Sequence, residues 1–249
     1  MCLILVGWQV HPDYPLVVAA NRDEFHARPT AAADFWPDAP DILGGRDLQA
    51  GGTWLGATRR GRFAAVTNVR EPGAPPGLRS RGELTSTFLR SSLSPIDYAE
   101  ALVAADYAGY NLLLGDGQTL VYASNRGIAS RELEPGIYGL SNHRLDTPWP
   151  KLLKAREQFA QALETLPGED AFFSLLADRR VEADEDLPNT GVPLVWERRL
   201  SAVFVQSADY GTRASTLLLR DRAGTVLLHE KSFAADGSKF QSSRISTAV

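Results

Sequence analysis

The sequence predicts an α+β protein in which two mainly antiparallel β-sheets carry helices on their outer faces. Short apolar segments typical of strands lie towards both ends of the chain, helical segments lie between them, and no Pro/Gly-rich linker divides the chain. The 249 residues are 44% hydrophobic and 22% charged, as in an ordinary globular protein. We therefore expect a single domain over residues 1–249.

The first third of the chain predicts a β-hairpin. Residues 2–6 and 16–20 are apolar, a turn-like segment joins them, and the second run ends at Asn21-Arg22-Asp23-Glu24. Residues 26–50 are rich in Pro, Ala and Asp, which indicates a surface excursion. Glycine-rich segments follow, and residues 62–68 then predict another strand.

The middle of the chain predicts three helices. Ser94 and Pro95 are suited to an N-cap and first-turn proline, so we expect a helix from there to about residue 105. Strands are expected at 111–114, 120–123 and 137–141. Apolar residues near helical spacing predict a helix over 150–166, and a further helix, capped by Asp170, is expected over 170–178. Residues 182–193 are expected to form an exposed loop.

The C-terminal part returns to β-structure. We expect strands at 202–205, 214–219 and 225–228, with a hairpin turn at 221–224. Residues 234–249 are polar and are expected to form a flexible tail.

Composition limits the classes of function. The net charge of −4 provides no field that favours nucleic acid or an anionic membrane. A single cysteine excludes an internal disulfide and a metal site with several thiolates, so no metal is expected. The N-terminus lacks the features of a signal peptide, and no apolar run approaches the roughly 20 residues that a membrane span needs. We expect a cytoplasmic protein without integral membrane association.

Cys2 is the only cysteine and directly follows Met1. Removal of Met1 is sterically easy before so small a side chain, and it would leave a thiol and a free α-amine on one residue. The α-amine has a pKa of roughly 7.7–8.0 and can act as a base for the thiol near neutral pH. The alternative is that Cys2 is only a small buried hydrophobic residue in the first strand.

Four further polar residues are candidates for the same site. A hairpin would bring Arg22 close to Cys2, where a guanidinium lowers a thiol pKa, and Asp23 could orient the α-amine. Asn68 and Asn142 each close a predicted strand, where an amide can stabilise an oxyanion. The alternatives are a solvated hairpin end and ordinary turn asparagines.

Arg213 is a further candidate, because it precedes a strongly apolar strand and could face the same site. Its alternative interpretation is an exposed charge at the edge of a sheet.

Motifs along nearly the whole chain resemble the NRDE family, which includes the transport and Golgi organisation 2 homologues. They are the opening Met-Cys-Leu-Ile, Ala-Asn-Arg-Asp-Glu-Phe at 20–25, Gly-Gly-Thr-Trp-Leu-Gly at 51–56, Thr-Asn-Val-Arg at 67–70, Ser-Arg-Gly at 80–82, Leu-Ser-Asn at 140–142 and Tyr-Gly-Thr-Arg at 210–213. The set occurs in family order, which makes the resemblance specific.

The family is in turn similar to the N-terminal nucleophile hydrolases that cleave conjugated bile acids and penicillin V. This resemblance implies a four-layer αββα sandwich. It places Cys2 as nucleophile and base, Asn68 and Asn142 as oxyanion and amine-binding asparagines, Arg22 and Asp23 beside the nucleophile, and Arg213 near a later active-site arginine. The hydrolases have Arg-Asn-x-Asp where this chain has Asn-Arg-Asp-Glu at 21–24, so the register of Arg22 stays open.

Three functions remain open. The first is a cysteine amidohydrolase that cleaves a small-molecule linear amide and needs no cofactor. The second is a non-catalytic binding or trafficking protein for haem or an acyl lipid, as relatives have been linked to haem trafficking and acyl-lipid metabolism. Haem would be bound non-covalently, with His143 as the best-placed histidine and Trp8, Trp36 and Trp54 as candidate cleft aromatics. The third is a protein–protein adaptor on an inert hydrolase scaffold. In each case we expect the site between the two sheets, where the first strand begins.

Overall fold

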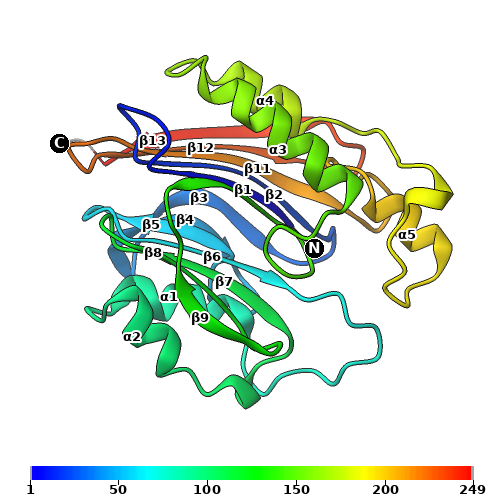
Figure 1. Cartoon of the computed structure of the whole chain (residues 1–249), viewed down its shortest axis with the longest axis horizontal. Coiled ribbons are helices and arrows are strands. Elements are labelled where there is room, and N and C mark those ends of the chain that lie inside the picture. Colours follow the sequence, from blue (N-terminus) through cyan, green and yellow to red (C-terminus); the bar gives the residue numbers. More distant parts are fainter. Residues whose placement is uncertain (1, 248–249) are drawn as a thin grey trace.

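The computed structural model describes residues 2–247 and contains two antiparallel β-sheets that pack face to face (Figure 1). The six-stranded sheet, here sheet A, places the N-terminal hairpin beside the last part of the chain. Its strands, in spatial order, are β10 (Gly136–Leu140), β1 (Cys2–Trp8), β2 (Leu16–Phe25), β11 (Tyr210–Arg220), β12 (Val226–Phe233) and β13 (Lys239–Ser246).

Sheet B has seven strands, and their spatial order is also their order in the sequence. They are β3 (Thr30–Trp36), β4 (Ala39–Asp47), β5 (Leu55–Thr58), β6 (Phe63–Asn68), β7 (Tyr110–Gly115), β8 (Leu120–Ser124) and β9 (Ile128–Glu132). Each strand pairs antiparallel with the next, so sheet B is a meander built from one continuous part of the chain.

Helices cover the outer face of each sheet. Sheet B carries α1 (Arg81–Arg90) and α2 (Pro95–Glu100), followed by the 3-10 turn η1 (Ala104–Asp106), and sheet A carries α3 (Pro150–Leu163) and α4 (Asp170–Leu176) (Figure 1). The connection from α4 to β11 holds η2 (Asp184–Asp186) and α5 (Leu194–Leu200). The layers are therefore helix, sheet, sheet, helix, which confirms the expected αββα sandwich. None of the helices within residues 2–247 is long and apolar enough to cross a membrane.

Alternation along the strands assigns each side chain to one of three apolar layers. In β1, Ile4 and Val6 face sheet B, whereas Leu3 and Leu5 pack against α3 and α4. The outer face of sheet B packs on α1 and α2 in the same manner. Cys2 and Arg22 lie opposite each other in the β1–β2 register, so both continue the face that looks towards sheet B. The side chains at this end of the hairpin are thereby aimed between the sheets.

Several helices begin as their sequences predict. The Ser94 hydroxyl accepts a hydrogen bond from the backbone N–H of Asp97, and Pro95 occupies the first turn of α2. Helix α3 starts at Pro150 as expected and buries Leu152, Phe159 and Leu163. Helix α4 begins at Asp170, but Glu169 occupies the N-cap position, so the expected capping role of Asp170 is wrong.

Several segments differ from the sequence-based expectations, and α1 and β9 were not expected at all. Residues 26–50 are not a simple surface excursion, because most of them form β3 and β4. Residues 202–205 are buried without forming a strand. Half of the expected flexible tail, 234–249, forms the edge strand β13, and its last two residues lie outside the described ones. β13 pairs with β12 between Leu227–Ser246 and Phe233–Lys239, and its polar sequence reflects its exposed face.

Candidate functional site

A cavity of about 310 Å³ lies between the two sheets at the end where β1 begins. Sheet A contributes Cys2 and the end of β2, sheet B contributes Val66 and Asn68, and Trp54 lies just before β5. The N-terminus of α1 closes another side. The volume is at the lower end of the range found for small-molecule sites.

Cys2 is the first residue of β1 and lies on the cavity wall with 8% of its surface exposed. Burial raises the pKa of the Cys2 thiol, although the nearby Arg22 guanidinium and the backbone N–H of Asp23 both favour the thiolate. Arg22 therefore acts in the expected direction but does not outweigh desolvation. The sulfur is mainly a thiol at neutral pH, so it needs a base in order to attack.

Arg22 lies directly opposite Cys2, which settles the register that the sequence left open. Its side chain is only 7% exposed, and its closest carboxylate contact is a 3.7 Å approach of Nη2 to Glu24. The buried Nη1 atom has no hydrogen-bond partner among the described residues. A guanidinium in this state is well placed to receive hydrogen-bond acceptors from a ligand.

Asp23 is held in a buried polar network next to Cys2. One of its carboxylate oxygens accepts a 2.7 Å hydrogen bond from the Thr212 hydroxyl, and Tyr210 donates to its backbone oxygen at 3.0 Å. Burial raises the pKa of the Asp23 carboxyl, while Lys151, Thr212 and Arg22 favour its charged form. The network fixes the side chain beside the nucleophile, where a carboxylate can hold an ammonium group.

Lys151 is a member of this region that sequence reasoning missed. Its ammonium group donates to the Leu200 carbonyl oxygen at 2.7 Å, and only 4% of the residue is exposed. Burial lowers the pKa of Lys151 to about 8, against the attraction of Asp23. The available signal was a lysine within the apolar pattern at the start of α3, where a buried face was expected.

Asn68 and Asn142 are in direct contact but have different positions. Asn68 lines the cavity, whereas Asn142 is fully buried and donates through Nδ2 to the side-chain oxygen of Asn68 at 2.9 Å and to its backbone oxygen at 3.1 Å. The Asn68 Nδ2 donates to the Val69 backbone oxygen at 3.2 Å. The structure therefore places one amide at the cavity and the other behind it as a support.

Arg213 does not line the cavity that Cys2 lines. The β2–β11 pairing shifts register between Thr212 and Ala214, and this bulge turns the arginine out of the regular strand pattern. Its Nη1 donates to three backbone oxygens, those of Phe25, His26 and Arg28. Arg213 thus ties down the segment after β2 and lines a smaller neighbouring cavity.

The candidate haem-binding side chains are mostly elsewhere. His143 contacts the Thr147 hydroxyl at 2.9 Å and the Trp149 ring, outside the cavity lining. Trp8 is buried between the sheets, and Trp36 is buried while donating to the Gly44 oxygen. Of the three tryptophans, only Trp54 lines the cavity.

A buried ion pair supports the rear of the site. Arg70 and Glu197 are 2.6 Å apart with side chains 4% and 5% exposed, and the Arg70 guanidinium lies over the Trp149 ring. The backbone N–H of Arg70 donates to the Asn142 oxygen at 2.7 Å. The pair therefore links α5 to the strand ends that hold the two asparagines. Sequence reasoning missed Glu197 because the segment before it was expected to be an exposed loop.

Comparison with known proteins assigns the family. The model of the family described as "Transport and Golgi organisation 2" matches residues 1–235. The chain belongs to this family. Its relatives include the transport and Golgi organization 2 homologs of Mus musculus and Homo sapiens, which are 37% and 36% identical over 93% of both chains. The Drosophila melanogaster transport and Golgi organization protein 2 is 26% identical, and the match covers 89% of this chain and 88% of the Drosophila protein.

Solved structures show the same fold at low sequence identity. A C2A mutant of the conjugated bile acid hydrolase from Clostridium perfringens matches with a TM-score of 0.51 and 8% identity, covering 98% of this chain and 92% of the other. A Caenorhabditis elegans ortholog of N-acylethanolamine-hydrolyzing acid amidase matches with a TM-score of 0.50 and 10% identity. This match covers 88% of this chain and 92% of the other. The family member thus has a fold like that of the N-terminal nucleophile hydrolases.

Proposed function

We propose that this transport and Golgi organisation 2 family member is a cysteine amidohydrolase acting on a small-molecule linear amide. The observation that carries the proposal is the position of Cys2 at the inner wall of an inter-sheet cavity, opposite Arg22 and with Asn68 in the same lining. The proposal requires cleavage of the Met1–Cys2 peptide bond, which gives Cys2 a free α-amine.

The α-amine would act as the base in the first half of the reaction. It takes the thiol proton as Sγ attacks the amide carbonyl carbon, and this forms the C–S bond and a tetrahedral oxyanion. The same proton then passes to the leaving nitrogen as the C–N bond breaks, leaving a thioester on Cys2. The carboxylate of Asp23 would stabilise the α-ammonium group that exists between these two proton transfers.

Water completes the cycle. It attacks the thioester carbon while the α-amine takes one proton, and the C–S bond breaks to return the thiol and release a carboxylic acid. One amide and one water give one acid and one amine. Asn68 supplies an N–H donor to the oxyanion in both halves, and Asn142 acts as a positioning residue because it occupies the Asn68 oxygen and so directs the amide.

The cavity lining gives little support to haem binding. Among the described residues of the lining, Cys2 is the only side chain of a type that commonly ligates haem iron. Binding of an acyl ligand without chemistry remains the alternative outcome of the experiments below.

The first experiment combines intact mass with turnover. Protein purified without an N-terminal tag should lack the mass of Met1 and hydrolyse members of a linear-amide panel, and Cys2→Ala should abolish turnover. Turnover that survives Cys2→Ala would refute the proposal. Retained Met1 with ligand binding but no turnover, or a Soret shift with haemin, would favour the binding alternative.

The asparagines allow a sharper test. Asn68→Ala should lower kcat by about 10²–10³-fold, as for loss of an oxyanion donor. Asn142→Ala should also lower kcat while leaving KM nearly unchanged. Asn125→Ala is the matched control, because Asn125 is itself outside the cavity lining and bonds backbone groups of Tyr107, Ala108 and Tyr110, of which only Ala108 lines the cavity. It should reduce thermal stability without a specific loss of kcat; an equal effect in both variants would indicate a purely structural role for Asn142.

A further inference from the structure

The arginines of the cavity differ in whether they are neutralised. Three of the five that line it are paired with carboxylates: Arg28 with Asp47 at 2.6 Å, Arg46 with Asp38, and Arg79 with Glu83. The remaining two are Arg22, whose ion pair with Glu24 is a longer one of 3.7 Å, and Arg81. An arginine with a close carboxylate partner attracts a ligand anion less strongly, so we expect Arg22 and Arg81 to contribute most to what the cavity binds.

Arg81 has neither a side-chain hydrogen bond nor an ion pair among the interactions of residues 2–247. It is half-buried at the first position of α1, and its guanidinium is close enough to Cys2 and Glu24 to interact electrostatically with both. Burial lowers the pKa of Arg81, which is the sign of a cation that lacks adequate compensation in the free protein.

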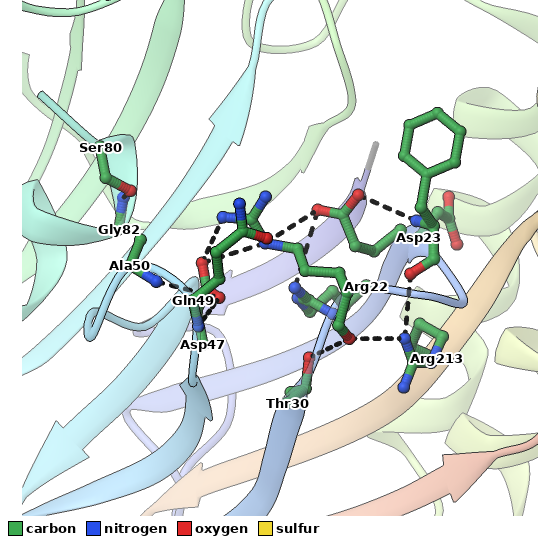
Figure 2. Close-up of polar contacts among 12 residues, drawn as sticks. Arg22, Asp23, Thr30, Asp47, Gln49, Ala50, Ser80, Gly82 and Arg213 are labelled. Atoms are coloured by element: carbon green, nitrogen blue, oxygen red, sulfur yellow. Dashed lines mark hydrogen bonds and ion pairs between the residues drawn. The ribbon is translucent and has the colours of Figure 1, made fainter. Parts of the chain in front are cut away.

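The start of α1 adds to the positive potential. Ser80 caps the helix by accepting a hydrogen bond from the backbone N–H of Gly82 (Figure 2). Ser80, Arg81 and Gly82 all line the cavity. The helix has ten residues, so its N-terminal end carries a partial positive charge directed at this space. Arg22 provides the independent observation, because its buried Nη1 has no partner in the described protein.

We propose that the cavity holds an anionic oxygen group of the substrate, a carboxylate or a phosphate, between Arg22, Arg81 and the N-terminus of α1. This inference rests on the proposed amidohydrolase function and names its substrate class: a linear amide that carries an acid close to the scissile bond. Trp54 and Val66 lie on the sheet B side of the same cavity and offer surface for the uncharged part.

The test measures binding separately from chemistry. Isothermal titration of the Cys2→Ala protein uses three probes of similar length: hexanoylglycine, hexyl phosphate and the neutral hexanoyl ethanolamide. At least one anionic probe should bind at least about tenfold more tightly than the neutral one, as a charged hydrogen bond provides. Preference between the carboxylate and the phosphate identifies the source of the anion.

Variants assign the effect to particular arginines. Arg81→Gln and Arg22→Gln should each weaken anion binding about 10- to 100-fold and leave the ethanolamide unchanged. Arg79→Gln is the matched control: it removes the same charge from the same lining, but from an arginine that is already paired, and should change binding less than threefold. If Arg22→Gln fails to fold, Arg22→Lys replaces it in the test, because lysine keeps the positive charge.

Equal affinity for neutral and anionic probes, equal losses in Arg81→Gln and Arg79→Gln, or no binding of any probe would each overturn the anion site. The proposed function fails separately. Selective binding of hexanoylglycine without its hydrolysis by the wild-type protein would retain the anion site and reject the hydrolase. Hydrolysis of linear amides without tighter binding of the anionic probes would retain the hydrolase and reject the anion site.

Discussion

Replacing Lys151 with methionine is expected to remove a pH dependence from the stability of this protein. Lys151 is 4% exposed, and burial lowers its pKa from 10.5 to about 8. Each unit between the folded and unfolded pKa corresponds to about 1.36 kcal/mol, so the difference amounts to about 3 kcal/mol. This is the free energy by which the buried charge destabilises the folded state at neutral pH.

The sign follows from proton binding. Below pH 8 the lysine is charged in both states, and the folded state carries the full desolvation cost. Between pH 8 and 10.5 the folded protein releases its proton first, so the unfolded state binds more protons and stability rises with pH. The wild type should therefore gain up to about 3 kcal/mol relative to Lys151→Met over this interval.

The assay is urea unfolding at a series of pH values from 7 to 10.5, with the difference in unfolding free energy between wild type and variant as the readout. Taking the difference cancels the titration of buried groups that do not interact with Lys151, and a Cys2→Ala background in both proteins removes the thiol that does. Lys154→Met is the control, since Lys154 lies on the same helix but is exposed and paired with Glu182. A difference that is flat with pH, or that falls, would refute the reasoning.

Two further predictions concern packing around the site. Arg70→Met should destabilise the protein by about 3–5 kcal/mol, because it leaves the Glu197 carboxylate buried without its cation. In a double-mutant cycle measured by chemical unfolding, the variant with both Arg70→Met and Glu197→Met should lose less unfolding free energy than the sum of the two single variants. Strictly additive losses would contradict this. Gly52→Ala should lower stability by about 1–3 kcal/mol, since its Cβ would lie 2.4 Å from the Gly82 carbonyl atoms at the start of α1. Gly115→Ala meets no atom closer than 3.5 Å, so a comparable drop in melting temperature for both variants would contradict the clash.

The sequence was sufficient for elements whose burial is regular. Residues 2–6 and 16–20 predicted the first hairpin because they are continuously apolar, and α3 was predicted from its apolar spacing. Helix α1 was not expected, because Gly82 and several polar residues conceal a buried stripe of only a few side chains. Strand β13 was hidden for a related reason: an edge strand with an exposed face needs no apolar pattern.

The sequence indicated some residues that line the cavity but not the contacts that they make. Cys2 and Asn68 reach the cavity because each sits at a strand end. Asn142 points towards Asn68 and not into the cavity, because of amide hydrogen bonds that form only in the assembled fold. Arg213 is redirected by a β-bulge, which is set by pairing with a strand almost 200 residues earlier.

The pairing of β1 has a consequence for the order of events during synthesis. One neighbour of this strand, β2, follows at once, but the other is β10, through pairs such as Ile4–Leu140. At about 5–20 residues per second, some 140 residues take roughly 7–28 s to be made. Until then the part of β1 from Ile4 to Trp8 has one open strand edge. All of sheet B, which ends at Glu132, is made before β10, so the hairpin can pack on sheet B before its open edge is closed. An apolar strand with an open edge can pair with other chains, so this interval is when the protein is most prone to aggregate.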